Sequence, residues 1–300
     1  MGGMTATATA PSGNLSSFGN GELRAGISGP FGTINAGAVN MNGLTTYVTG
    51  QPFSTAIGGG YGSVTRVNTT GNAVRADNSV MYVSPAFSGL TLTLYKAMAQ
   101  TKAAATTFSN ALGNYDHAGS QEIGANYSNG PIAASFSQLK QNKTGIGTNA
   151  SATPYDNTET TLTSIGANYT MGALKLFLLN QTNKNDATNR VNMAFTSVSA
   201  TYTMGNTVLM AQSGTFDNKA AYGSANTNGA TVVDKSNLLG LGLDYNLSKT
   251  TALYVRHESI KDKANILGGY YSTATSVFDT ASGSAGETRK RTAVGLRVGF

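Results

Sequence analysis

The last ten residues alternate strictly between two kinds of side chain, and this alternation limits the folds open to the chain. Val294, Leu296, Val298 and Phe300 fall on one face of an extended strand, whereas Arg297 falls on the other. A period of two residues indicates a β-strand with two different faces. Ten residues is also the length that a tilted strand needs to cross a membrane. The chain therefore ends in a strand that could span a bilayer.

Similar alternation recurs along the chain and predicts about thirteen strands. The motif IGANYS at Ile123–Ser128 returns as IGANYT at Ile165–Thr170, and each copy precedes a tight connection and a new strand. The copies are thus interpreted as hairpins. The approximate strand ranges are 22–28, 32–39, 79–85, 90–98, 120–129, 131–141, 161–171, 173–182, 195–203, 206–214, 236–247, 250–259 and 290–300.

The composition narrows the fold class further. Only 11% of the residues are charged and only 40% are hydrophobic, whereas a typical soluble domain carries roughly 25% charged residues. The sequence has no apolar run of the ~20 residues that a membrane helix needs. A β-barrel in lipid satisfies both facts, because only every second strand residue must be apolar. We therefore expect an all-β, transmembrane antiparallel β-barrel.

The sequence contains no pattern that indicates catalysis or nucleic-acid binding. The chain has no Cys, and its two histidines, His117 and His257, lie far apart in the sequence. None of the common catalytic, phosphate-binding or calcium-binding motifs is present. The net charge is +6, but the basic residues are scattered rather than clustered as in nucleic-acid-binding proteins. We expect no enzyme activity, no cofactor, no metal and no nucleic-acid partner.

Short turns alternate with long polar connections, which is the pattern of outer-membrane barrels. Four tyrosines lie on the apolar face close to a short turn, where an interfacial aromatic girdle belongs. Ordinary strand packing is the alternative interpretation of these tyrosines. They are Tyr127, Tyr169, Tyr202 and Tyr245.

Several of these segments resemble the general porins of Gram-negative bacteria, in particular the beta-proteobacterial type. The resemblance rests on GISGPFGTINAGAV (Gly26–Val39), on RADNSVMYVSPAFSGLTLTLYK (Arg75–Lys96), on LSKTTALY (Leu247–Tyr254) and on the terminal Phe300. It implies a 16-stranded barrel that assembles as a homotrimer. It also implies that a long loop, here about residues 40–77, folds into the channel as a constriction, and that Phe300 is the signal read by the barrel-assembly machinery.

The chain departs from this family pattern in two respects. About three strands and a signal peptide that the family has before residue 22 are not present, so residues 1–21 are expected to be a disordered or loop segment before a single barrel domain of residues 22–300. The family also places acidic residues on the constriction loop, yet residues 41–76 contain no Asp or Glu.

The parity of the strands selects candidate pore-lining residues. Each arginine could instead form a structural ion pair; Arg256 with Glu258 on the same face is the clearest case, and Arg291 could simply be solvated near a loop. The candidates for the pore wall or the constriction are Arg24, Arg66, Arg75, Asp77, Glu122, Asp244, Arg256, Glu258 and Arg297.

These features predict an outer-membrane porin that lets small hydrophilic solutes and ions diffuse passively, with a weak preference for anions. Its expected partners are outer-membrane lipid, two further copies of the chain, the barrel-assembly machinery, and small hydrophilic solutes and anions. Two alternatives remain. One is a substrate-selective porin of the same fold, although no row of aromatic residues is evident on the lumen face as a sugar channel would require. The other is an outer-membrane adhesin or surface antigen that uses its long loops.

Overall fold

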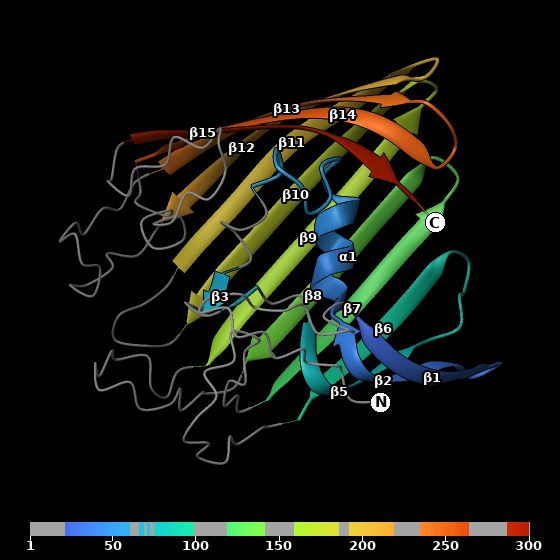
Figure 1. Cartoon of the computed structure of the whole chain (residues 1–300). Helices are drawn as coiled ribbons and strands as arrows, with labels where there is room; N and C mark the ends of the chain where they lie inside the picture. Colours follow the sequence, from blue (N-terminus) through green and yellow to red (C-terminus); the bar gives the residue numbers. More distant parts are fainter. Residues whose placement is uncertain are drawn as a thin grey trace, which may run out of the picture.

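The chain forms one large antiparallel sheet of thirteen strands, in which each strand of the sheet pairs with the next along the chain (Figure 1). The computed structural model describes residues 22–60, 66–68, 71–72, 75–98, 119–141, 159–185, 192–218, 235–263 and 287–299. The sheet is strongly curved, and Figure 1 shows the only helix of these residues inside the curve. Among the described residues, β1 and β15 each pair on one side only.

The strands agree with the alternation of the sequence, and the expected all-β antiparallel fold is confirmed. The sheet consists of β1 (Leu23–Gly29), β2 (Gly32–Asn40), β5 (Arg75–Val83), β6 (Leu90–Ala97), β7 (Ser120–Asn129), β8 (Ile132–Gln141), β9 (Thr160–Met171), β10 (Leu174–Asn185), β11 (Asn192–Met204), β12 (Thr207–Asn218), β13 (Lys235–Asn246), β14 (Thr251–Asp262) and β15 (Glu287–Val298).

Three of the short turns have the same construction. The residues Asn129 and Ile132 pair across a two-residue loop, and Met171–Leu174 and Met204–Thr207 pair in the same way. In each loop the first residue is a glycine with φ between 54° and 57°. A positive φ at this position is required by the type II′ hairpin turn, which matches the twist of the flanking strands. The three glycines therefore set the register of three hairpins.

The two faces of the sheet differ in the way that the alternation predicts. The outward, convex face exposes large apolar side chains, for example Leu176, Val198, Leu241 and Leu296. The inward face is covered in part by the segment that follows β2, and two apolar clusters lie beneath it. One consists of Val39, Met41, Met81, Tyr95, Ala97, Leu139 and Leu162, and the other of Tyr47, Leu179, Phe195, Phe216, Leu238 and Ile260.

The long connection between β2 and β5 contains secondary structure that the sequence did not reveal. It holds the helix α1 (Asn42–Thr49) and a two-stranded sheet formed by β3 (Arg66–Asn68) and β4 (Gly71–Asn72). Among the described residues, no helix is long and apolar enough to cross a membrane.

Candidate functional site

The segment Met41–Gly60, which we call the internal segment, crosses the inward face of the sheet. Its helix α1 contacts β7, β8 and β9. Further along, Gly50 approaches Gly166 of β9, and the carbonyl of Gly58 approaches Gly240 of β13. The internal segment therefore spans the inside of the curved sheet from β7 to β13, and its position decides how much of the interior stays open (Figure 1).

A carboxylate of the curved sheet, which we call the wall, holds the first end of the internal segment. Met41, the N-cap of α1, makes no side-chain capping bond. Instead Glu122 of β7 accepts hydrogen bonds from the backbone N–H groups of Asn42 at 2.5 Å and Gly43 at 2.7 Å. These are two of the four N–H groups that a helix start leaves without a partner, and the helix dipole favours a carboxyl group as the acceptor at this end of the helix. Glu122 thus supplies the cap that the local sequence lacks.

Polar side chains of the wall fix the rest of α1. The amide of Asn42 donates to the carbonyl of Phe136 at 2.8 Å and accepts from Asn126 at 2.8 Å. The hydroxyl groups of Thr46 and Ser135 lie 2.7 Å apart. At the end of the helix, Asn168 donates to the carbonyl of Thr49 at 2.8 Å. These bonds come from three strands, so the helix has one fixed position on the wall.

A second carboxylate holds the far end of the internal segment. Glu258 of β14 is 1% exposed and accepts hydrogen bonds from the backbone N–H groups of Gly58 and Gly60, both at 3.0 Å. Its other oxygen forms an ion pair with Arg291 of β15. Hydrogen bonds to an ionised group are roughly twice as strong as neutral ones. The internal segment is therefore clamped at both ends by acidic residues of the wall.

Small residues on the wall let the backbone of the internal segment approach closely. A Cβ atom added at Gly240 would lie 2.1 Å from the carbonyl oxygen of Gly58, and one added at Gly166 would lie 2.2 Å from the carbonyl oxygen of Thr46. Both neighbours are backbone atoms, which cannot move aside alone. The internal segment can therefore follow its observed path only if both of these positions are glycine.

We expect that a Gly240→Val substitution displaces Gly58 from the wall. The added atoms would overlap its carbonyl oxygen, so the hydrogen bonds from Gly58 and Gly60 to Glu258 should lengthen or break. Overpacking of this kind costs about 1–3 kcal/mol. Hydrogen exchange of the Gly58 and Gly60 amides should accelerate. Ala211→Val, which adds the same kind of volume on the outward face, serves as the control and should leave this exchange unchanged; an equal rate in both variants would contradict the assignment.

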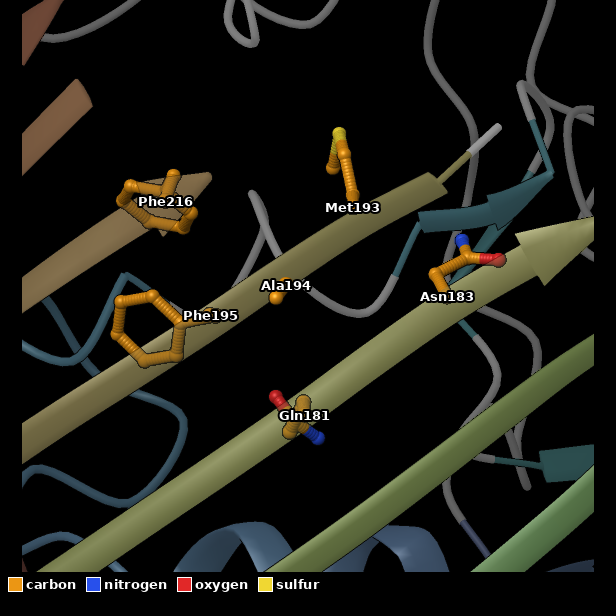
Figure 2. Close-up of a pocket in the computed structure, with 6 residues that line it drawn as sticks. All are labelled: Gln181, Asn183, Met193, Ala194, Phe195 and Phe216. Atoms are coloured by element: carbon orange, nitrogen blue, oxygen red, sulfur yellow. The ribbon is translucent and has the colours of Figure 1, made fainter. Parts of the chain in front are cut away.

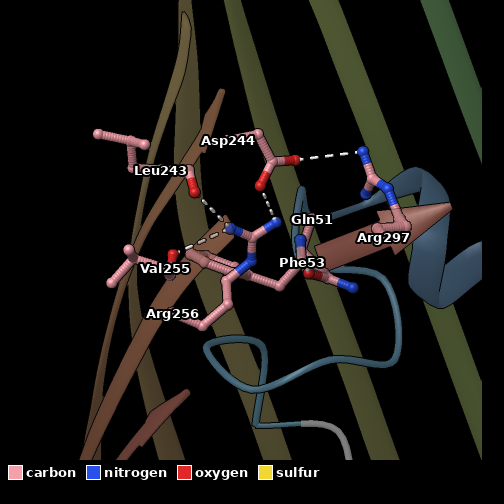
Figure 3. A network of polar contacts seen from close by, with 7 residues as sticks. All are labelled: Gln51, Phe53, Leu243, Asp244, Val255, Arg256 and Arg297. Atoms are coloured by element: carbon pink, nitrogen blue, oxygen red, sulfur yellow. Dashed lines mark hydrogen bonds and ion pairs between the residues drawn. The ribbon is translucent and has the colours of Figure 1, made fainter. Parts of the chain in front are cut away.

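A network of three charged side chains lies beside the middle of the internal segment (Figure 3). Arg256 is almost buried and pairs with Asp244 at 2.6 Å, while it also donates to the carbonyl groups of Leu243 and Val255. Asp244 also pairs with Arg297 at 3.4 Å. The ring of Phe53 lies 5.9 Å from the Arg256 guanidinium.

The ion pairs differ from those that the sequence suggested. Arg256 pairs with Asp244 rather than with Glu258, and Arg291 is bonded to Glu258 rather than simply solvated. Residues two apart on one strand lie about 6.6 Å from one another, whereas residues opposite on neighbouring strands lie about 5 Å apart. Glu258 and Arg291 are such an opposite pair in the register. In both cases the observed partner lies on a neighbouring strand and not on the same strand.

The inward acidic and basic side chains differ in how much of their surface is exposed. The carboxylates Glu122, Asp244 and Glu258 are all buried and bonded, whereas the Arg297 side chain keeps 61% of its surface exposed. The other inward arginine with large exposure, Arg24, keeps 48% and pairs with Glu22 at 3.3 Å. The accessible inward charge of the described strands is thus mainly positive.

Two aromatic residues pack together on the inward face of the sheet. Phe195 and Phe216 face each other across β11 and β12, and their ring centroids lie 4.5 Å apart. Figure 2 shows them beside a small pocket that is also lined by Gln181, Asn183, Met193 and Ala194. Both rings are at most 1% exposed. They pack into the wall and do not form a track that a sugar could follow.

The remaining candidate residues take varied positions. Arg75 lies at the start of β5 opposite Asn40, and Arg66 lies in β3 opposite Asn72. Asp77 lies within β5. The side chains of Arg66 and Asp77, the residues Phe300 and His117, and the segment 1–21 fall outside the described part of the chain.

The four tyrosines Tyr127, Tyr169, Tyr202 and Tyr245 each lie in a strand close to a short turn, and the last three are 43–48% exposed on the outward face. Their assignment to an interfacial girdle remains a prediction.

Several polar residues that fix the internal segment had no signal in the sequence. Gln51, which is 1% exposed, accepts from the N–H of Phe53 at 2.6 Å and donates to the carbonyl of Ser54 at 2.7 Å. Tyr47 donates its hydroxyl hydrogen to the carbonyl of Gly59 at 2.8 Å. These partners lie within the internal segment, so its own side chains stabilise its fold.

Comparisons with known proteins agree with this geometry. The family described as Gram-negative porin matches residues 2–265. Outer membrane porin protein 32 of Delftia acidovorans is 32% identical over 239 residues, which is 76% of this chain and 58% of that protein. The chain thus spans somewhat more than half the length of this relative.

Among solved structures, the chain is similar to the anion-selective porin from Comamonas acidovorans, with a TM-score of 0.67 and 24% identity over 92% of this chain and 77% of the other. It is also similar to the trimer form of OmpT, an outer membrane protein of Vibrio cholerae, with a TM-score of 0.59 and 18% identity over 92% and 79% of the two chains. At these identities the likeness shows the fold.

Proposed function

The chain belongs to the Gram-negative porin family of the outer membrane, and from that premise we propose that it forms a water-filled channel for the passive diffusion of small hydrophilic solutes and ions, with a weak preference for anions. The family consists of channel proteins rather than enzymes. The function therefore depends on the shape and charge of the interior and not on a reactive group.

The observation that carries this proposal is the clamp on the internal segment. Glu122 and Glu258 hold its two ends against β7 and β14. A segment that is held in one place across the inside of a curved sheet narrows the interior by a constant amount. Because it is held at both ends, it does not move about and block the interior. A protein that used only its outer loops for adhesion would have no need of such a clamp. The internal segment is accordingly proposed as the constriction.

The proposed anion preference follows from the bonding of the inward carboxylates, which are all engaged with other groups of the protein. Glu122 and Glu258 are bonded to backbone N–H groups, and Asp244 is shared between Arg256 and Arg297. The guanidinium of Arg297 remains accessible to solutes. A positive charge in a narrow passage with low-dielectric walls raises the local concentration of anions.

We also propose that three copies of the chain assemble into a trimer, and that the barrel-assembly machinery reads the C-terminal strand that ends at Phe300. The trimer form of OmpT, a protein with the same fold, supports the first of these proposals. Cross-linking of the refolded chain in detergent would test the number of copies.

Planar-bilayer recording in a salt gradient tests the function. We expect stepwise insertions, with a reversal potential that favours anions. A reversal potential that favours cations would retain the channel and reject the charge argument. A correctly refolded chain that never conducts would reject the channel and favour the adhesin.

A further inference from the structure

The helix α1 turns its more polar side to the wall and its apolar side to the open interior. The buried residues of α1, which lie on the side that contacts the wall, are Asn42, Gly43, Thr46 and Tyr47. On the opposite side Leu44 and Val48 lie one turn apart, and Val48 keeps 40% of its surface exposed. This is the reverse of the usual amphipathic helix, which buries its apolar side. The stability of α1 therefore does not explain why these two residues are apolar.

The part of the internal segment that follows α1 continues this apolar surface. Pro52 and Ile57 are half-buried, and Ala56 is exposed. We call these three residues, together with Leu44 and Val48, the apolar lining. Because the internal segment lies on the inward face of the sheet, its exposed atoms border the interior (Figure 1). Apolar side chains that stay exposed in a concave part of a protein are typical of surfaces that contact a ligand.

The internal segment adds no charge to the interior. No residue from Met41 to Gly60 is charged. The carboxyl groups of Glu122 and Glu258, which contact this segment, are buried and accept hydrogen bonds from its backbone. A solute that passes the segment therefore meets apolar groups and neutral hydroxyl groups on this side. A fully hydrated solute gains nothing from the apolar groups, whereas a solute with an apolar part removes some of its own surface from water when it touches them.

An exposed positive charge is connected to the apolar lining through a short series of contacts. Phe53, which follows Pro52, has its ring 5.9 Å from the guanidinium of Arg256. Arg256 shares Asp244 with Arg297, whose side chain is exposed (Figure 3). A guanidinium can bind a carboxylate through two parallel hydrogen bonds. An exposed arginine near an apolar surface suits an anion that has a carboxylate at one end and an apolar group at the other.

We propose that the channel favours small monocarboxylates with an apolar tail over anions of the same size that carry a hydroxyl group instead. The carboxylate pairs with Arg297, and the tail contacts the apolar lining as the solute moves past the internal segment. The arginine acts on the charge of the solute and the apolar lining acts on its tail, so the two contributions can be measured separately. The proposal rests on the proposed channel function and names its preferred class of solute.

Isobutyrate and lactate test this preference, because they have the same shape and differ by a methyl group in place of a hydroxyl group. Reversal potentials of the refolded full chain, with chloride on one side of the bilayer and either acid anion on the other, give the two permeabilities. Contact that removes about half of the methyl group from water predicts an isobutyrate preference of about twofold. This preference is measured relative to the ratio of the mobilities of the two anions in water.

Val48→Thr keeps the shape of the side chain but makes it polar, so the isobutyrate preference should fall toward the ratio in water. Val48→Ala removes apolar surface without adding a hydroxyl group and should act in the same direction. Arg297→Gln should lower the permeability of both acid anions relative to potassium and leave the ratio between the two anions unchanged. The matched control is Val198→Thr, which makes the same replacement on the outward face of β11 and should keep the preference. Heat-dependent electrophoretic mobility checks that each variant has folded.

The proposal would be overturned if the unchanged chain passed the two anions in the ratio of their mobilities in water. It would also be overturned if both Val48 variants kept the preference, or if Val198→Thr lowered it as much as Val48→Thr. Each of these outcomes leaves the proposed channel intact, provided that the chain gives stepwise conductance in potassium chloride. A correctly refolded chain that never conducts would reject the channel itself, and the solute preference with it.

Discussion

Replacing Glu258 by alanine is expected to release the far end of the internal segment and to lower the free energy of unfolding by about 3 kcal/mol. Removing one partner of a buried ion pair costs about 3–5 kcal/mol, and the lower value applies because the Arg291 side chain is 19% exposed and can be partly rehydrated. The substitution also removes the acceptor of the Gly58 and Gly60 N–H groups. Urea titration of the refolded chain would measure the loss of stability.

A second measurement separates release of the segment from general instability. Hydrogen exchange at Gly58 and Gly60 should accelerate more than exchange within β8 or β9. Glu258→Gln keeps the volume but not the charge, so it should show a smaller change in the same direction. Glu159→Ala is the matched control, because Glu159 forms an exposed ion pair with Lys140 at 3.3 Å, and exposed pairs contribute only about 0–1 kcal/mol. Unchanged protection in Glu258→Ala would show that the clamp does not depend on this carboxylate.

The sheet could be predicted from the sequence because the patterns that indicate it lie within each strand and each short turn. Alternation within each strand marks the outward face, and the turn glycines Gly130, Gly172 and Gly205 mark the hairpin ends. Each strand of the sheet pairs with its neighbour along the chain, so the order of the strands follows once the strands are found. The parity of Glu122, Asp244, Arg256 and Arg297 was predictable for the same reason.

The internal segment could not be predicted because its stability comes from distant residues. Thr45, Thr46 and Val48 are β-branched, which lowers the helix propensity of α1, and the N-cap Met41 makes no capping bond. The cap is Glu122, eighty residues further along the chain. No sequence pattern close to the helix predicts a contact with a residue so far along the chain. The sequence therefore indicated only a long glycine-rich connection.

The ion pairs were missed for a related reason. The expected Arg256–Glu258 pair followed from the shared face of one strand, whereas the actual partners lie on β13 and β15. The register between strands decides which side chains meet, and the sequence alone did not fix that register. The inward phenylalanines Phe195 and Phe216 illustrate the same limit, since their contact becomes visible only when β11 and β12 are paired.

Replacing Arg297 by glutamate is expected to shift the ion selectivity toward cations. In water, a unit charge at about 6 Å contributes roughly 0.7 kcal/mol to the energy of an ion, and screening at 0.1 M salt roughly halves this value. A change of two charge units should therefore lower the local anion concentration about three- to fourfold and raise that of cations by a similar factor, which changes the permeability ratio by about tenfold. The reversal potential in a salt gradient measures this ratio.

Arg297→Gln changes the charge by one unit and should give an intermediate shift. Lys249→Glu makes the same two-unit change in the exposed turn between β13 and β14, so its effect should be clearly smaller. Arg256→Gln is the informative contrast inside the network: the Arg256 side chain is only 7% exposed and is bonded to Asp244, so its loss should reduce stability more than selectivity. If Arg297→Glu and Lys249→Glu shifted the reversal potential equally, the selectivity would come from the overall charge of the channel mouth, and the exposed guanidinium beside the internal segment would not be its source.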